Sequence, residues 1–437
     1  GKRKLGVLSV AFLVVAASAP LTVVAGGVTT ALAVTGSTAI PFGYIVLTVA
    51  LVLFAVGYAA MSRFVTNAGA FYAYVSQGLS RALGVGSSLI ALVAYNMMQI
   101  GVAALLGFQV STELKARWAI DTPWYLWVFV AIVIVGVLGV NRIDFSAKVL
   151  GILVALEFLV VIIFDVTGFM AAPDGVPAAP IMGTTFWGAS TGAILAFGIA
   201  AFMGFESGAL YGEESKNPKT TIARATYLSV VVIGVFYAIS SWAMIAAGGA
   251  TVNADAVAGP AYFFGLLGAQ AGTVIADIAS LLFITSLFAS LVSFHNAVAR
   301  YNFSLGREGI LPRGLAKVTN AGAPWVGSLV QTVIAAVVTL GFIIGEAGTN
   351  GQYVDPNGLG EGVSLNLFPL LVEFNWLTNS GAMGLVLLMA LVSLAVLGYF
   401  AKSKHGVSLW SRVIAPIIAA IALFGVFGII VANFNVL

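Results

Sequence analysis

The stretch AFGIAAFMGFESGALYGEESKNPKTTIARA, residues 196–225, decides the fold of the chain. It begins as an apolar helix, loses its regularity around Gly204 and Glu206, and ends in the polar run EESKNP at 213–218. Glycine weakens a helix, and a carboxylate at the bilayer centre costs at least ~2.5 kcal/mol. The two are tolerated together where irregular backbone is buried in protein or lines a water-filled cavity. The stretch therefore predicts a broken membrane helix beside such a cavity, with a kinked packing helix as the alternative.

The composition indicates a membrane protein. Of 437 residues, 60% are hydrophobic and 8% are charged, whereas soluble domains carry about 25% charged residues. The chain has no cysteine, which excludes disulfides, thiol chemistry and cysteine-ligated metals. Its basic start at 2–4, followed by an apolar run, is typical of a secretory signal. The apolar pattern continues well past Ala19, so we predict a first membrane helix and no cleavage site.

The apolar runs predict an all-α polytopic fold with eleven membrane helices, since one crossing takes about 20 residues. These helices are predicted at 8–35, 40–62, 85–112, 124–140, 146–169, 188–211, 221–247, 273–301, 324–345, 367–400 and 412–433. Two short interfacial helices are predicted at 69–81 and 257–268. The polar insertion EFNW at 373–376 restricts the predicted membrane part of the tenth helix to 380–400.

The lysines and arginines predict the orientation. In this topology all of them except Lys115 and Arg117 fall on the side of the N-terminus. Basic residues accumulate on the cytoplasmic side of a membrane protein, so we predict a cytoplasmic N-terminus in the cell's inner (cytoplasmic) membrane. Because the basic residues mark topology, the net charge of +3 requires no nucleic-acid partner.

Several motifs give the chain a family resemblance. The residues G-F-E at 204–206, E-E-x-K-N-P at 213–218 and I-x-R-A at 222–225 resemble the sixth helix and following loop of amino acid–polyamine–organocation (APC) transporters. Residues NAGAFYAY at 67–74 are similar to the family's G-G-x-Y-x-Y segment, with alanine replacing the first glycine. Residues REGILP at 307–312 resemble its R-x-G-x-x-P loop. The resemblance covers nearly the whole chain.

The resemblance implies a bacterial amino acid permease with a LeuT-type fold, made of two inverted repeats of five helices with discontinuous helices one and six. It implies a small amino acid or an amine as substrate, a coupling ion, and no cofactor. Relatives commonly have twelve membrane helices, so a twelfth is expected beyond Leu437. The eleventh, at 412–433, would be an accessory helix.

Helix one carries the Gly26-Gly27 pair near mid-span, as helix six carries Gly204. Glycine-interrupted spans at matching positions of two halves point to a transporter substrate site, although glycine pairs also serve close helix packing. The interval of five helices between the two glycine breaks predicts repeats at about 8–169 and 188–400 within one transport domain.

The two breaks predict how a substrate binds. Freed N–H groups at a half-helix start in helix one suit a carboxylate, and freed carbonyls with Glu206 suit an ammonium. Phe202 and Phe205 are expected to close over the substrate side chain. The candidate substrate-binding residues are Ala25, Gly26, Gly27, Val28, Phe202, Gly204, Phe205 and Glu206. A diamine would depend more on Glu206, so a polyamine or amine importer or exchanger is the alternative function.

Glu157 lies about nine positions into helix five, too deep to reach the membrane surface. Several APC relatives carry a lysine near this point, thought to stand in for a coupling sodium ion, whereas this chain has a carboxylate. A buried carboxyl group can carry a proton through the transport cycle, and Glu206 is a second candidate for this role. A purely structural Glu157 and a sodium ion held by Ser286 or Ser290 are the alternatives.

The sequence does not indicate an enzyme. It has no P-loop GxxxxGK[ST] motif and no cluster of metal-ligating residues. Paired broken helices suit occlusion of a substrate better than a continuous pore, which disfavours a channel. The prediction is a secondary transporter, a symporter that moves a small amino acid by alternating access with coupling to protons.

Overall fold

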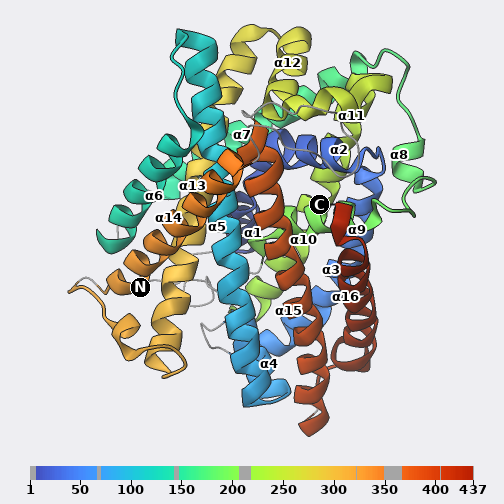
Figure 1. The fold of residues 1–437 in the computed structure, drawn as a ribbon. Helices are drawn as coiled ribbons and strands as arrows, with labels where there is room; N and C mark the ends of the chain where they lie inside the picture. Colours follow the sequence, from blue (N-terminus) through green and yellow to red (C-terminus); the bar gives the residue numbers. More distant parts are fainter. Residues whose placement is uncertain are drawn as a thin grey trace.

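A computed structural model describes residues 6–65, 70–141, 147–205, 218–320, 322–348, 367–403 and 405–436. This part of the chain is helical and contains no strand (Figure 1). Nine of its helices are long and apolar enough to cross a membrane. These spans are carried by α3 (Ile40–Ser62), α5 (Arg81–Trp118), α6 (Trp124–Asn141), α7 (Ala147–Met170), α10 (Pro218–Gly248), α13 (Thr273–Arg307), α14 (Trp325–Gly348), α15 (Asn375–Lys402) and α16 (Ala415–Ala432).

Short helices lie at the two ends of the bundle. α4 (Ala70–Gly78) lies at one end, and α11 (Val252–Asp255) and α12 (Pro260–Ala271) lie at the other (Figure 1). We call these ends the α4 face and the α12 face. α4 and α12 correspond to the interfacial helices predicted at 69–81 and 257–268. The short α8 (Ala179–Met182) follows α7.

Helix one is broken, but not where the glycine pair predicts. It consists of α1 (Val7–Ala17), the π-helical η1 (Thr22–Val28) and α2 (Thr29–Thr35). The break lies at Ser18 and Ala19, where Ala19 has a φ of 51°. The second half then begins with Pro20, which lacks an N–H and whose ring would clash with a preceding helical carbonyl.

The prediction of an unwound backbone at Gly26-Gly27 is therefore wrong. Both glycines lie inside η1, which continues directly into α2. Gly26 serves close packing instead, because a Cβ atom there would lie 2.8 Å from Leu105 Cδ2. All residues of η1 except Gly27 are buried.

Helix six breaks where the sequence predicts. α9 (Thr191–Phe202) ends at Phe202, and Met203 turns to extended backbone with a ψ of 136°. Gly204 follows with a φ of 106°, a conformation that glycine adopts without strain. Glu206 and the polar run at 213–217 lie outside the described residues.

The tenth membrane helix is longer than the sequence predicts. The π-helical η7 (Pro369–Phe374) runs without interruption into α15, so the span extends over Pro369–Lys402. The expected restriction to 380–400 is wrong because the polar residues Glu373 and Asn375 are fully buried. Asn375 satisfies its side-chain amide locally, by donating to the Leu371 carbonyl at 3.2 Å.

Candidate functional site

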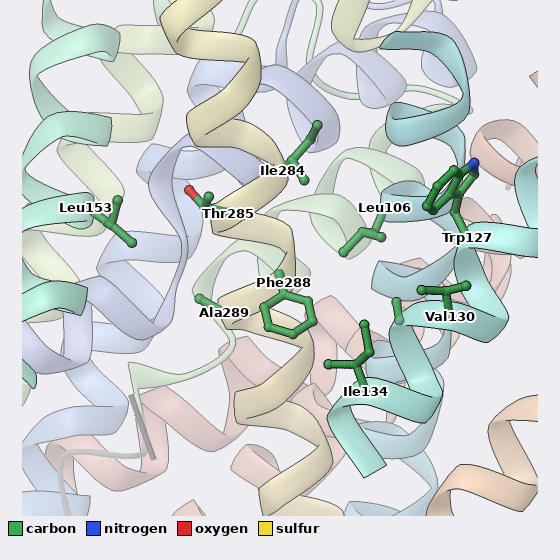
Figure 2. Close-up of a pocket in the computed structure, with 10 residues that line it drawn as sticks. Leu106, Trp127, Val130, Ile134, Leu153, Ile284, Thr285, Phe288 and Ala289 are labelled. Carbon is green, nitrogen blue, oxygen red and sulfur yellow. The ribbon is translucent and has the colours of Figure 1, made fainter. Parts of the chain in front are cut away.

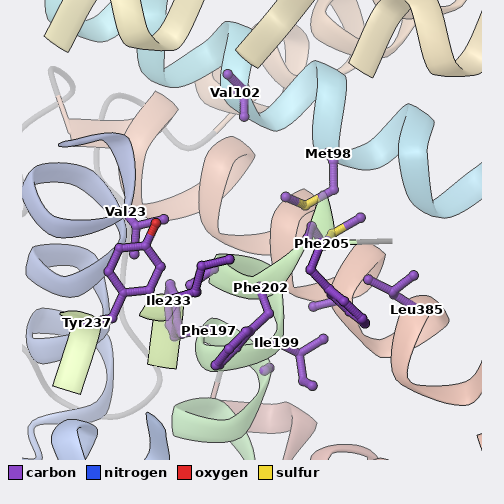
Figure 3. Close-up of a cluster of buried hydrophobic side chains, with 14 of the residues drawn as sticks. Val23, Met98, Val102, Phe197, Ile199, Phe202, Phe205, Ile233, Tyr237 and Leu385 are labelled. Carbon is purple, nitrogen blue, oxygen red and sulfur yellow. The ribbon is translucent and has the colours of Figure 1, made fainter. Parts of the chain in front are cut away.

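A small cavity lies between the two broken helices. Its volume is about 50 Å³, and helices one, two, three, six, eight and ten contribute to its wall. The lining residues are Ser18, Thr22, Val23, Gly27, Tyr44, Met98, Val102, Phe197, Ala200, Ala201, Met203, Ser290, Phe294, Phe374 and Thr378. Figure 3 shows Val23, Met98, Val102 and Phe197 among the buried side chains of this region. Carbon atoms and a few hydroxyl groups therefore form its surface.

Of the predicted helix-one residues, the structure places Gly27 in the cavity wall. Ala25, Gly26 and Val28 are buried in η1 but do not line the cavity. Ser18 and Thr22 line it instead. The sequence signal for these two residues was Pro20, because a proline inside an apolar run ends a helix just before it.

The two phenylalanines that were expected to close over the substrate, Phe202 and Phe205, pack against other aromatic rings in this structure. Phe202 packs on Tyr44 with ring centroids 6.4 Å apart, and Phe205 packs edge-on against Phe54 at 6.0 Å. Neither Phe202 nor Phe205 lines the cavity, and neither does Gly204, whereas Met203 does. The aromatic rings that line it are those of Tyr44, Phe197, Phe294 and Phe374.

Glu157 of α7 lies directly behind the cavity wall. Its side chain is almost fully buried, and Oε2 accepts a hydrogen bond from Ser286 Oγ at 2.8 Å. The Leu21 N–H donates to the same oxygen at 3.4 Å. Thr22 Oγ1 lies 3.0 Å from Ser286 Oγ, which continues the chain of contacts to the cavity. The carboxyl group of helix five is thus connected to the small cavity by two hydroxyl groups.

The half-helix that follows the break begins at this carboxylate. Residues 20–35 are helical without interruption, so Leu21 presents one of the unpaired N–H groups of a helix N-terminus. Helix N-termini favour negative charge. Glu157 therefore occupies an anion-binding position built by the break in helix one.

A hydroxyl contact of Ser18 connects the break in helix one to α10. Its Oγ donates to the Val15 carbonyl at 2.7 Å and lies 2.8 Å from the Tyr237 hydroxyl. Tyr237 is fully buried. The contact fixes the irregular backbone at the cavity wall.

None of the described residues that line the cavity is charged. The ion pairs among the described residues are Lys115–Asp121, Arg117–Glu113 and Arg117–Asp277, all toward the α12 face. In the same part of the chain, no group of three metal-ligating side chains occurs. His295 contacts Ser328 Oγ through Nε2 at 2.7 Å in the packing between α13 and α14.

A series of aromatic rings connects the cavity to the α4 face. Phe294 contacts Tyr95 at 6.2 Å between ring centroids, Tyr95 contacts Tyr301 at 5.7 Å, and Tyr301 contacts Tyr72 at 6.2 Å. Tyr72 in α4 ends this aromatic series by donating a hydrogen bond to Glu308 Oε1 at 3.1 Å. Burial and the Glu308 carboxylate raise the pKa of Tyr72 to about 12, so its phenol stays protonated. The rings thus form a packed connection between the cavity and α4.

A larger cavity of about 290 Å³ lies elsewhere, between α5, α6, α7 and α13 (Figure 2). Its lining residues are Leu106, Trp127, Val130, Ala131, Ile134, Leu153, Ile284, Thr285, Phe288 and Ala289. The Thr285 hydroxyl donates to the Leu282 carbonyl. Val130 is 38% exposed and Ile134 is 44% exposed, so the cavity opens on the bilayer side of α6. Apart from the Thr285 hydroxyl and the Trp127 indole N–H, the side chains of its wall are apolar.

Comparison with known proteins identifies the family. A family model described as amino acid permease matches residues 5–436. The chain belongs to the amino acid permease family. This family lies within the APC superfamily, as the motifs predict. The permease is a multi-span membrane protein that transports amino acids, and its relatives are transporters and not enzymes.

Two relatives are about a quarter identical to the permease over roughly two thirds of its length. The branched-chain amino acid permease BcaP of Lactococcus lactis subsp. cremoris (strain MG1363) is 26% identical over 328 residues, which cover 69% of each chain. The branched-chain amino acid permease BcaP of Bacillus subtilis (strain 168) is 26% identical over 336 residues, covering 70% of the permease and 69% of that protein.

Solved structures confirm the predicted LeuT-type fold. MhsT in complex with L-phenylalanine matches with a TM-score of 0.62 and 14% identity, over 96% of the permease and 98% of that chain. A mutant of the Eremococcus coleocola manganese transporter matches with a TM-score of 0.55 and 13% identity, over 98% and 95% of the two chains. The division into repeats at 8–169 and 188–400 stays a prediction.

Proposed function

We propose that the permease is a secondary active symporter that moves a neutral, apolar amino acid together with a proton, by alternating access at the cavity between helices one and six. The observation that carries this proposal is the contact chain from Glu157 through Ser286 to Thr22 at the cavity wall. In the proposed orientation the protein lies in the cytoplasmic membrane with its N-terminus and α4 face in the cytoplasm.

The cavity wall supports a neutral substrate. Its rings and methionines suit an aliphatic or aromatic side chain, and Ser18, Thr22 and Ser290 supply hydroxyls for the polar end. The two relatives are branched-chain amino acid permeases by name, and MhsT was solved with L-phenylalanine. Among the described lining residues no side chain is acidic, which disfavours a polyamine. Glu206, which lies outside the described residues, keeps an amine substrate as the alternative.

The cavity must widen for transport. A volume of about 50 Å³ holds little more than one water molecule, whereas ligand sites usually measure about 300–1,000 Å³. The structure therefore corresponds to a closed arrangement of the proposed cycle. Movement at the break in helix six and separation of the aromatic series would open the site toward the α4 face.

The geometry suggests how the proton and the substrate are coupled. The Glu157 carboxylate and a substrate carboxylate favour the same helix N-terminus, and two negative charges there would repel each other. A proton on Glu157 removes this repulsion. It also weakens the hydrogen bonds that the carboxyl group accepts from the Leu21 N–H and the Ser286 hydroxyl. These donors then become available to the substrate, so proton binding favours substrate binding, and the reverse holds by linkage.

The test is uptake of L-leucine by the permease in proteoliposomes, with an inward proton gradient and no sodium. We expect the gradient to drive accumulation, a protonophore to abolish it, and Glu157→Gln to remove the dependence on the gradient. Asp165→Asn is the matched control, because Asp165 is a second buried carboxylate of α7 that accepts from Ser240 Oγ at 2.9 Å. Uptake that requires sodium, or a Glu157→Gln variant with normal proton dependence, would overturn the coupling. Transport of putrescine without leucine transport would favour the amine alternative.

A further inference from the structure

Another buried carboxyl group, that of Glu373, lies behind the part of the cavity wall that helix ten forms. Glu373 belongs to the π-helical η7 and its side chain is completely buried. π-Helical turns inside membrane helices frequently mark functional sites. Neither the fold nor the proposed coupling through Glu157 accounts for an acid at this place.

The two carboxyl oxygens of Glu373 have different surroundings. Oε1 accepts a hydrogen bond from Thr339 Oγ1 of α14 at 3.0 Å. Oε2 is buried and has no hydrogen-bond partner in the described part of the chain. An ionised carboxylate at this depth without a cationic partner is strongly disfavoured. The neutral acid is therefore the form that this closed arrangement holds, and its proton is not tied to any acceptor there.

Glu373 is directly connected to the substrate cavity. Phe374, the next residue, contributes its ring to the cavity wall, and so does Thr378 one turn later. Thr378 Oγ1 donates to the Phe374 carbonyl at 2.7 Å. A substrate that displaces the Phe374 ring would therefore also move the backbone that carries Glu373.

A route from Glu373 leads toward the α12 face. Thr339 and Glu346 are two helical turns apart and lie on the same side of α14. Glu346 lies closer to the end of α14 and is only partly buried, and its Oε2 accepts from Trp124 Nε1 at 3.0 Å. Glu346 is close enough to Glu373 for the two carboxyl groups to interact electrostatically.

The other titratable groups on the helices around η7 have separate partners or lie elsewhere. On α5, Arg117 and Lys115 pair with acids near the α12 face, and Tyr95 belongs to the aromatic series. α15 carries Tyr399 and Lys402 at its α4-face end, and α2 carries no titratable residue. Within the described residues, Glu346 is thus the ionisable group that interacts electrostatically with Glu373.

We propose that Glu373 is a second proton-binding site of the permease, filled from the α12 face by way of Glu346 and emptied when the substrate moves η7. The proposal deepens the proposed function, because it adds a proton that is distinct from the one on Glu157. The two sites flank the cavity, one behind helix one and one behind helix ten.

The experiment is infrared difference spectroscopy of the purified permease on addition of L-leucine. We expect the carbonyl band of a protonated carboxyl group to change on substrate binding, to be lost in Glu373→Gln and to be retained in Glu157→Gln. Thr339→Val is the matched variant. It removes the hydrogen bond to Oε1 without removing the acid, so it should shift the band and not abolish it.

Each outcome decides the proposal. A folded Glu373→Gln variant that still binds leucine and keeps the wild-type band shows that the proton lies elsewhere, and an absence of any substrate-dependent carboxyl band in the wild type also overturns the site. A Glu373 band in a permease whose uptake ignores the proton gradient would sustain this site and refute the proposed symport. In the coupled wild type, Glu346→Gln should slow proton-driven uptake from the α12 face while the Glu373 band remains.

Discussion

The two broken helices of the permease reach similar irregular conformations by different chemistry. Helix one breaks at Ala19 and Pro20, where a proline sets the start of the next half-helix. Helix six breaks at Met203 and Gly204, where glycine adopts a φ of 106°. Proline reduces the number of backbone conformations and glycine increases it. The break in helix one thus suits a fixed binding geometry, which Glu157 already uses, and the break in helix six suits movement.

The largest effect is expected at the helix-six break. Gly204→Ala places a side chain at a φ of 106°, which costs about 1–3 kcal/mol and restricts the hinge. We expect uptake to fall by about tenfold or more, since 1.4 kcal/mol corresponds to tenfold. Gly188→Ala, just before α9, is the control, because an added Cβ there meets nothing within 4 Å. Normal uptake by Gly204→Ala would refute the idea that this break must stay mobile.

An intermediate effect should separate the two glycines of helix one. In Gly26→Ala the new Cβ lies 2.8 Å from Leu105 Cδ2 and 3.4 Å from Phe283 Cζ, and such overpacking costs about 1–3 kcal/mol. In Gly27→Ala the nearest side-chain atom is Val23 Cγ1 at 4.0 Å, so stability should stay normal. Because Gly27 lines the cavity, its alanine variant should instead reduce uptake of larger substrates.

Melting temperatures of both variants in detergent and competition by amino acids of increasing size would test this difference. Equal destabilisation by the two substitutions would show that the packing of η1 is misassigned. An unchanged substrate preference in Gly27→Ala would remove Gly27 from the binding site.

The smallest effect is expected for Ala19→Gly, and the test is whether this substitution raises or lowers the free energy of unfolding. A non-glycine residue at a φ of 51° is strained, and relief of left-handed strain is worth about 1–2 kcal/mol per residue. Ala19→Gly should therefore raise stability by about 1 kcal/mol, less a few tenths for the greater freedom of the unfolded chain. Thermal unfolding in detergent would measure it, and a lower melting temperature would indicate that Ala19 itself makes a needed contact.

Most of the architecture could be predicted from the lengths of the apolar runs and from the position of glycine within a helix. Gly204 was correctly assigned to the helix-six break, and Glu157 was correctly predicted to be buried. The break in helix one was misplaced because a glycine pair was weighed above Pro20, although a proline removes a helical hydrogen bond and glycine only weakens the helix.

The cavity-facing aromatic residues could not be predicted from the sequence for a physical reason. α9 is apolar on all sides, so its pattern does not reveal which face points inward. Phe197 and Phe202 are equally apolar, and only the packing of the surrounding helices places Phe197 at the cavity and Phe202 against Tyr44. Ser286 and Ser290 were candidates for the same sodium site, but Ser286 bonds Glu157 of α7 and Ser290 lines the cavity, a difference that depends on how α7 packs.

The hydrogen bond between Tyr72 and Glu308 bears on the equilibrium between closed and open states of the substrate-free permease. A hydrogen bond to a charged group contributes about 1.5–3 kcal/mol, which shifts a two-state population by about 10- to 150-fold. In the proposed cycle, this one bond, at 3.1 Å between the tyrosine hydroxyl and the carboxylate, would therefore favour the state that is closed at the α4 face. A carrier that seldom opens there without substrate would let few protons through unaccompanied.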